Sequence, residues 1–157
     1  KGCLAMAYYL IDERKIDENS SAMKQAMKGI PFVPAYSVKA NHIPHIIRRF
    51  YDNGYLAEVV SDIEVDIAKS AGVPCSHMIY NGPAKGRKAD DVLEAGGIVV
   101  FDSPEDMNNV HRVGRCMFRV AINIENGLDT RFGTKPELIP SAVRKARDIG
   151  FDACSNI

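Results

Sequence analysis

The sequence lacks the features that mark several common classes of protein. Its 20 basic and 20 acidic residues leave no net charge, so it has no excess charge to attract nucleic acid or a membrane surface. Its longest apolar runs are far too short to span a bilayer. Its four cysteines form no CxxC pair and do not combine with its four histidines at zinc-site spacing. We therefore expect no metal site, no nucleic-acid partner and no membrane segment.

The composition that remains is that of an ordinary globular domain. Of the 157 residues, 46% are hydrophobic and 25% are charged, which is enough apolar material for a real core. Asp12, Glu13 and Arg14 directly follow the apolar start without a small-residue cleavage pattern, which argues against a signal peptide. The scattered cysteines are typical of small core residues in a reducing compartment. These observations predict a cytoplasmic location.

Apolar runs and helical patterns alternate along the whole chain. Short runs rich in Val, Ile, Phe and Tyr predict strands, and the segments between them have helical apolar spacing. One unit takes about twenty residues, which is the length of a βα unit with short loops. The predicted strands are 32–39, 56–60, 77–80, 98–101 and 115–123, and the predicted helices are 43–52, 62–71, 85–95 and 104–112.

Polar residues favour a barrel over an open sheet. Lys39, Glu58 and Arg119 lie within or at the ends of predicted strands, and further polar residues (Ser61, Asn81, Asp102 and Ser103) follow directly at strand exits. In a (β/α)8 TIM barrel such positions converge on one face, where active sites are built. No GxGxxG motif follows the first strand and no GxxxxGK(S/T) motif occurs, so nucleotide-binding open sheets lose support. We therefore predict an α/β fold of the (β/α)8 TIM-barrel type.

The number of strands is too small for a complete barrel. There are five predicted strands, and residues 151–157 resemble the beginning of a sixth, whereas a barrel needs eight strands and ~250 residues. We expect residues 1–157 to be the N-terminal portion of a barrel domain, with about five to six βα units, in a larger protein.

The first predicted strand carries a lysine in an unusual setting. Residues 36–41 read Tyr-Ser-Val-Lys-Ala-Asn, and strand alternation would place Ala35, Ser37 and Lys39 on one face. The small neighbours leave room beside the amine, and a positioned lysine can act as a nucleophile towards an aldehyde. A solvated lysine that closes a strand is the alternative interpretation of this residue alone.

With its other motifs, the chain resembles a known family. It is similar to the barrel domain of the pyridoxal-phosphate-dependent amino acid decarboxylases of the alanine-racemase-like fold, the group with diaminopimelate, ornithine and biosynthetic arginine decarboxylases. The most specific match is 36–41, which looks like the family's Schiff-base motif. The other matching segments follow the family's order and are 7–12, 54–64, 81–85, 101–105, 118–120 and 131–133.

Four positions depart from the family's usual pattern. Glu58 stands where Asp is usual, and Arg131 stands where Lys is usual in a Lys-Phe-Gly signature. Pro83 makes the turn after Asn81 unlike the commonest diaminopimelate decarboxylase form. Residues 42–44, His-Ile-Pro, differ from the Tyr-Gly-His-Gly of alanine racemases, which argues against the racemase branch.

The resemblance implies an activity and a set of residues for it. Lys39 would hold pyridoxal 5'-phosphate as a Schiff base, and Glu58 and Arg119 would bind the cofactor near its ring. The reaction would be decarboxylation of a basic or dibasic amino acid, of the diaminopimelate, ornithine, lysine or arginine type, by a homodimer. The phosphate loop and the partner-subunit residues would lie beyond Ile157, so the 157 residues alone would bind cofactor poorly and would not turn over.

Other interpretations stay open at this point. The substrate could be an intermediate of a specialised biosynthetic pathway, for which Pro83 leaves room. The chain could also belong to a non-catalytic regulatory relative, although such a protein needs no Schiff-base lysine. Glu58 and Arg119 could form a structural ion pair between strands.

Overall fold

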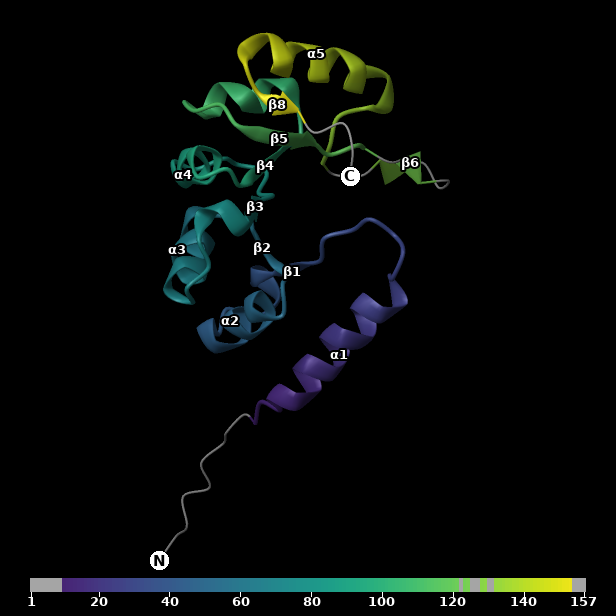
Figure 1. Ribbon diagram of the computed structural model, residues 1–157. Coiled ribbons are helices and arrows are strands. Elements are labelled where there is room, and N and C mark those ends of the chain that lie inside the picture. Colours follow the sequence, from purple (N-terminus) through teal and green to yellow (C-terminus); the bar gives the residue numbers. More distant parts are fainter. Residues whose placement is uncertain (1–9, 122, 125–127, 130–131, 154–157) are drawn as a thin grey trace, which may run out of the picture.

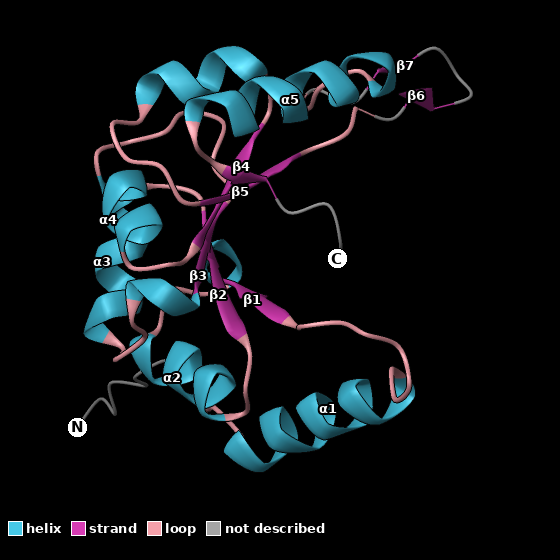
Figure 2. Cartoon of the chain, turned by 45° about the horizontal axis from the view of Figure 1, so that its top comes forward, coloured by secondary structure: helices cyan, strands magenta, loops and turns pink. Residues whose placement is uncertain are grey.

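The chain forms a curved layer of parallel strands with helices along its outer side (Figures 1 and 2). A computed structural model describes residues 10–121, 123–124, 128–129 and 132–153. The main sheet contains β1 (Ala35–Ser37), β2 (Leu56–Val59), β3 (Met78–Tyr80), β4 (Ile98–Phe101), β5 (Arg115–Phe118) and β8 (Asp152–Ala153). The helices are α1 (Glu13–Ala26), α2 (Pro44–Asp52), α3 (Asp62–Ser70), α4 (Lys88–Glu94) and α5 (Ile139–Ile149). The 3-10 helices are η1 (Val38–Ala40), η2 (Cys75–His77), η3 (Pro104–Asn109) and η4 (Pro136–Leu138), and β6 (Asn123–Ile124) pairs with β7 (Leu128–Asp129) in a separate antiparallel ribbon.

The order of the strands in the main sheet follows the order of the chain. Each strand pairs in parallel with the next, in the order β1-β2-β3-β4-β5-β8. A doubly wound sheet reverses its order at a switch point, and this sheet has no reversal. The predicted α/β class is confirmed, and the strand order is that of part of a (β/α)8 barrel wall.

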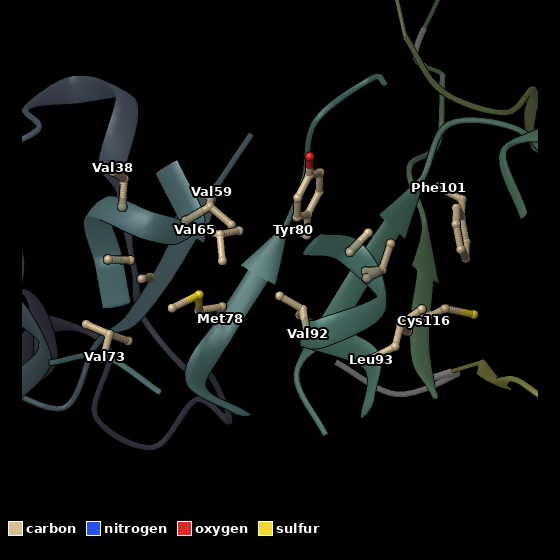
Figure 3. Packing of buried hydrophobic residues seen from close by; sticks show 14 of the residues in the cluster. Val38, Val59, Val65, Val73, Met78, Tyr80, Val92, Leu93, Phe101 and Cys116 are labelled. Atoms are coloured by element: carbon tan, nitrogen blue, oxygen red, sulfur yellow. The ribbon is translucent and has the colours of Figure 1, made fainter. Parts of the chain in front are cut away.

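The core lies between the sheet and helices α2, α3 and α4 (Figure 3). Figure 3 shows Val59, Met78 and Tyr80 pointing from their strands towards Val65 and Val92 of the helices. Each of these five side chains is at most 1% exposed, and burial of one such side chain contributes about 2 kcal/mol to folding. The alternation of buried and half-buried residues in β2 and β3 therefore points one face of each strand at the helices and the other at the barrel interior.

Local capping fixes where the helices begin. The Asp12 side chain accepts a hydrogen bond of 3.2 Å from the Lys15 amide at the start of α1. The Ser61 hydroxyl caps α3 in the same way, by accepting from the Glu64 amide at 3.3 Å. Within the described part of the chain, no helix is long and apolar enough to cross a membrane.

The inner face of the sheet is hollowed at the amino ends of the strands. The hollow has a volume of about 900 Å³ and is lined mostly by apolar side chains, among them Phe32, Leu56, Ile98 and Met117. Active sites of barrels lie at the opposite, carboxyl ends of the strands. The hollow is therefore a part of the barrel interior and not the candidate site.

Several predicted elements are shorter than expected, among them the helix predicted at 85–95, which covers only Lys88–Glu94. The first strand covers only Ala35–Ser37 and not 32–39, because Pro34 has no N–H to donate to a ladder and because the Asn41 amide turns back to the Val38 carbonyl at 3.2 Å. The strand predicted at 115–123 ends at Phe118, and Asn123 belongs to the separate ribbon. The helix predicted at 104–112 is only the 3-10 helix η3. The last four residues of the strand predicted at 151–157 lie outside the described residues, and its first part contains β8.

Candidate functional site

The carboxyl ends of five adjacent strands bring the polar residues of the sequence to one edge of the sheet. Lys39 follows β1, Glu58 lies near the end of β2, and Asn81, Asp102 and Arg119 directly follow β3, β4 and β5. Because the strands are parallel and in sequential order, these positions form an arc along the rim of the barrel wall. The convergence that the sequence predicted is therefore present.

Lys39 is carried by an anchored turn. It lies in η1, next to Val38, which is completely buried, and the Lys39 side chain itself is exposed. The Tyr36 hydroxyl donates to the Asn41 carbonyl at 3.2 Å, and its ring stacks on Phe50 with 4.3 Å between the centroids. The Asn41 side chain accepts from the Ile43 amide at 3.0 Å. These contacts fix the backbone on both sides of an amine that can reach a ligand at the strand ends.

Strand alternation predicted that Lys39 shares a face with Ala35 and Ser37, and this prediction is wrong. The ladder ends at Ser37, whose register partner is Glu58, and the chain then turns into η1. The Ser37 hydroxyl is buried and has no hydrogen-bond partner among the residues that the structure describes. Lys39 is thus two residues past the point where β1 pairs with Glu58.

Glu58 and Arg119 are joined through Asn81. The Asn81 Nδ2 donates to Glu58 Oε1 at 2.8 Å, while its backbone carbonyl accepts from Arg119 Nη2 at 3.0 Å. The Asn81 Oδ1 accepts a second hydrogen bond from the same Nη2 atom. No ion pair joins Glu58 directly to Arg119 among the described residues, so the two charges act on each other across the Asn81 amide.

Arg119 continues the network to the next strand. Its Nη1 lies 3.2 Å from Asp102 Oδ1, and its guanidinium lies 5.5 Å from the centroid of the Phe132 ring. Its backbone amide donates to the Phe101 carbonyl at 2.9 Å, which extends the pairing of β5 with β4. Arg131, the other member of the predicted Arg-Phe-Gly motif besides Phe132 and Gly133, lies outside the described residues.

Asp102 is the least satisfied group of the network. Its side chain is 14% exposed, and both carboxylate oxygens are buried without a partner in hydrogen-bond geometry. The contact with Arg119 is therefore an ion pair that leaves acceptor capacity free. The Thr134 hydroxyl donates to the Asp102 backbone carbonyl at 2.8 Å and fixes the end of β4.

A contact between His42 and Glu64 braces the turn that carries Lys39. His42 Nε2 lies 3.3 Å from Glu64 Oε1, and Glu64 is 6% exposed. The other oxygen of Glu64 accepts from the Val60 amide at 2.9 Å, just beyond β2. Glu64 thus connects the loop after Lys39 to the strand of Glu58.

Two connecting residues of the site were not predicted from the sequence. Asn81 and Asp102 are polar residues at predicted strand exits, whereas the predicted site residues are Lys39, Glu58 and Arg119 alone. The signal was present, because Asn81 and Asp102 occupy the same exit positions on neighbouring strands. Among the described residues, no cluster of three or more His, Cys, Asp or Glu side chains could hold a metal ion.

The donor set fits the cofactor that the resemblance implies. Pyridoxal phosphate needs an accessible amine for its aldehyde, and Lys39 supplies one. A charged aromatic ring needs fixed partners of both signs, and Glu58 and Arg119 stand on strands of the same rim. Within the described part of the chain, the buried side-chain oxygens of Ser37 and Asp102 have no hydrogen-bond partner, which leaves polar capacity for a ligand.

Comparison with known proteins also points to a protein that uses pyridoxal phosphate. Residues 13–140 match the family model described as the pyridoxal-dependent decarboxylase, pyridoxal binding domain. The diaminopimelate decarboxylase of Deinococcus radiodurans is 28% identical over 154 residues, which cover 92% of this chain and 40% of that protein. The L-glutamyl-[BtrI acyl-carrier protein] decarboxylase of Niallia circulans is 24% identical over 162 residues, which cover 92% of this chain and 37% of that protein.

A solved structure shows the same fold. The lysine decarboxylase of Selenomonas ruminantium matches with a TM-score of 0.72 and 25% identity, over 88% of this chain and 38% of that one. The chain thus spans less than half the length of these relatives, and the predicted TIM-barrel type of fold is confirmed for the part that is present. By its match over most of its length, the chain belongs to the pyridoxal-dependent decarboxylase family, whose cofactor is pyridoxal phosphate.

Proposed function

We propose that residues 1–157 are the N-terminal part of the barrel domain of a decarboxylase that uses pyridoxal phosphate to remove carbon dioxide from a basic or dibasic amino acid. The observation that carries this proposal is the position of Lys39. Its amine extends from an anchored turn at the carboxyl end of β1, beside the Glu58–Asn81–Arg119 network of β2, β3 and β5.

Each of the three predicted site residues has a role in this proposal. Lys39 is the catalytic residue and holds the cofactor through its amine. Bound pyridoxal phosphate supplies an aldehyde and an electron sink for the charge left when carbon dioxide departs. Glu58 and Arg119 bind the cofactor by presenting opposite charges from β2 and from the end of β5, and Asn81, between them, keeps these charges at a fixed separation.

The names of the relatives support the substrate class. A diaminopimelate decarboxylase and a lysine decarboxylase both act on amino acids with a second amino group, as their names state. In this proposal the whole protein is a cytoplasmic homodimer whose remaining barrel strands and phosphate loop lie outside these 157 residues. The 157 residues alone would then lack the phosphate cradle and would not turn over.

A second candidate substrate has an observation in its favour. By its name, one relative acts on a glutamyl unit attached to an acyl-carrier protein. Its match covers 92% of this chain, the same share as the match to the diaminopimelate decarboxylase. Pro83 in the exposed turn after Asn81 is the sequence feature that leaves this option open.

The experiment is to identify the lysine that binds the cofactor in the full-length protein. An absorbance spectrum with pyridoxal phosphate is recorded before and after borohydride reduction, and the reduced adduct is located by peptide mapping. We expect the adduct at Lys39, its loss in Lys39→Ala, and its retention in Lys88→Met, whose side chain pairs with Asp66 away from the site. Carbon dioxide release is then screened with lysine, ornithine, arginine and diaminopimelate. An adduct at another lysine, or none, would contradict the proposal and favour a non-catalytic relative.

A further inference from the structure

Lys85 is directed into the site and not into solvent. Its Nζ donates a hydrogen bond to the Gly82 carbonyl and lies 5.8 Å from the centroid of the Phe101 ring. Phe101 is completely buried at the end of β4 (Figure 3). The contact with its ring therefore places the ammonium group against the core beside the strand ends. A solvated lysine before a helix would have neither contact.

The charged groups that act on Lys85 are Asp106, Asp102 and Arg119, of which the last two belong to the network. Burial lowers the pKa of Lys85, the carboxylates of Asp106 and Asp102 raise it, and the Arg119 guanidinium lowers it. Asp106 is already held, because it accepts from the Asp102 and Ser103 amides at 2.8 and 3.2 Å. The negative charge of Asp102 is therefore offset by two cations, Arg119 in an ion pair and Lys85 at longer range.

The turn that Lys85 holds is pressed against β2. The Asn81 amide donates to the Val59 carbonyl at 2.7 Å. A Cβ atom on Gly82 would lie 2.1 Å from the Val60 carbonyl oxygen, so only glycine allows this approach. With the Gly82 carbonyl satisfied by Lys85, the turn is held from the side opposite to β2.

The Asn81 side chain depends on this turn for its position. It donates to Glu58 and accepts from Arg119, and a reversed amide would set oxygen against carboxylate and N–H against guanidinium. The charges therefore fix the direction of the amide, and the turn fixes its distance from both partners.

We propose that Lys85 is a positioning residue of the cofactor site: it holds the Asn81–Gly82 turn on β2 and offsets the charge of Asp102, so that Asn81 bridges Glu58 and Arg119. The inference rests on the proposed function of that site. Among the described residues Arg119 is the ion-pair partner of Asp102, and the Lys85 charge acts on this carboxylate without an ion-pair contact. Without the Lys85 charge, Asp102 attracts Arg119 more strongly and draws it away from Asn81.

Lys85→Met, Lys85→Arg and Lys88→Met in the full-length protein test this role. Lys85→Met keeps the length of the side chain without its charge, and Lys88→Met is the matched control, since Lys88 pairs with Asp66 outside the network. Pyridoxal phosphate affinity is measured by absorbance titration over a range of pH. We expect Lys85→Met to bind about tenfold more weakly, the effect of one lost hydrogen bond from a charged group, and Lys88→Met to bind normally.

The pH profile separates positioning from a general loss of structure. As the pH approaches the ordinary lysine value of 10.5, the wild type should lose affinity, because the Lys85 charge is lost below that value. Lys85→Arg stays charged and should keep its affinity there, and Lys85→Met should show no such loss because it is already weakened. Equal affinities and equal profiles for all variants would overturn the inference.

Crystal structures decide the inference even if the cofactor does not bind. In crystals of Lys85→Met and of Lys85→Arg, the distance between Asn81 Nδ2 and Glu58 Oε1 is compared with the 2.8 Å of the wild type. A break of this contact in Lys85→Met, and its retention in Lys85→Arg, supports the inference. An unchanged Asn81 in Lys85→Met refutes it, whereas a wild-type protein without a Lys39 adduct refutes the proposed function alone. If Lys85→Met does not fold, Lys85→Arg decides alone. A Lys85→Arg variant whose cofactor affinity falls with rising pH as that of the wild type does also refutes the inference.

Discussion

Asp102 and Arg119 form an ion pair with 3.2 Å between Oδ1 and Nη1 across the ends of β4 and β5. The Asp102 side chain is 14% exposed and that of Arg119 is 29% exposed, so water screens the pair only in part. The pair ties the candidate cofactor site to the stability of the barrel wall, because Arg119 serves both.

Removal of the Arg119 charge should therefore destabilise the fold as well as weaken cofactor binding. We expect Arg119→Met to lower the free energy of unfolding by about 2 kcal/mol, because the buried Asp102 carboxylate loses its ion-pair partner while some water still reaches it. Urea denaturation measures this change. The double variant with Asp102→Asn should recover part of the loss, since no unpaired charge then remains. Additive losses in the two single variants would contradict a coupled pair.

The length of Glu58 matters as much as its charge. Glu58 stands where the family that the chain resembles usually has Asp. With its longer side chain, Glu58 Oε1 lies 2.8 Å from Asn81 Nδ2. We expect Glu58→Asp to break this contact and to weaken pyridoxal phosphate affinity about tenfold. Glu58→Gln keeps the length and can still accept from Asn81, so its loss reports the charge alone.

Absorbance titration of the full-length variants separates the two effects. If Glu58→Asp binds the cofactor as tightly as the wild type, then the Asn81 bridge does not position the carboxylate. If Glu58→Gln alone is weak, the charge acts without the bridge.

The close approach at Gly82 gives a third prediction. The Cβ atom in Gly82→Ala would lie 2.1 Å from the Val60 carbonyl oxygen and 2.8 Å from its carbon, and both are backbone atoms that cannot rotate away. We expect this variant to lose about 2 kcal/mol of stability and to displace Asn81 from Glu58. Ala84→Ser, in the same turn but exposed, is the matched control and should unfold like the wild type. Thermal and urea unfolding give the stabilities, and a wild-type midpoint for Gly82→Ala would refute the prediction.

The sequence predicted the elements better than their connections. Alternating apolar runs fix the strands of a buried parallel sheet, so β2, β3 and β4 were placed within one residue. The resemblance identified Glu58 and Arg119, and the structure places them three strands apart in the wall but linked. The bridge through Asn81 was not predictable, because an asparagine after a strand more often serves a turn, and its two partners lie 23 and 38 residues away.

Local interactions explain the wrong boundaries. Lys39 was expected in a strand because Val38 continues an apolar run, yet Val38 is buried in a 3-10 turn that ends the ladder. In η3, the Asp106 carboxylate accepts hydrogen bonds from the Asp102 and Ser103 amides. The helix ends at Asn109, because the backbone of Val110 is already extended. Such competition between side chain and backbone is not visible in a periodicity.

The docking of α1 on α2 should depend on pH through Asp17. Its carboxylate accepts from Arg49 Nε at 2.9 Å and Nη2 at 2.5 Å, and from Asn53 Nδ2 at 2.9 Å. The hydrogen bonds from Arg49, then those from Asn53, hold the pKa of Asp17 below its ordinary value of 3.8. A depressed carboxyl pKa stabilises the folded state fully above 3.8, and this contribution is lost as the pH falls through the lower folded value.

Hydrogen exchange of the α1 amides, corrected for the intrinsic rate at each pH, measures this docking. We expect protection of α1 relative to α3 to fall only below pH 3.8, and to be low already at neutral pH in Asp17→Asn. Glu18→Gln is the control, because among the described residues Glu18 pairs only with Arg14 and Lys15 of the same helix. Glu13 and His45 form a second contact of 2.7 Å between α1 and α2, so some protection of α1 should persist in Asp17→Asn. Equal protection of α1 in Asp17→Asn and the wild type at neutral pH would show that apolar packing, and not the Asp17–Arg49 pair, holds this helix.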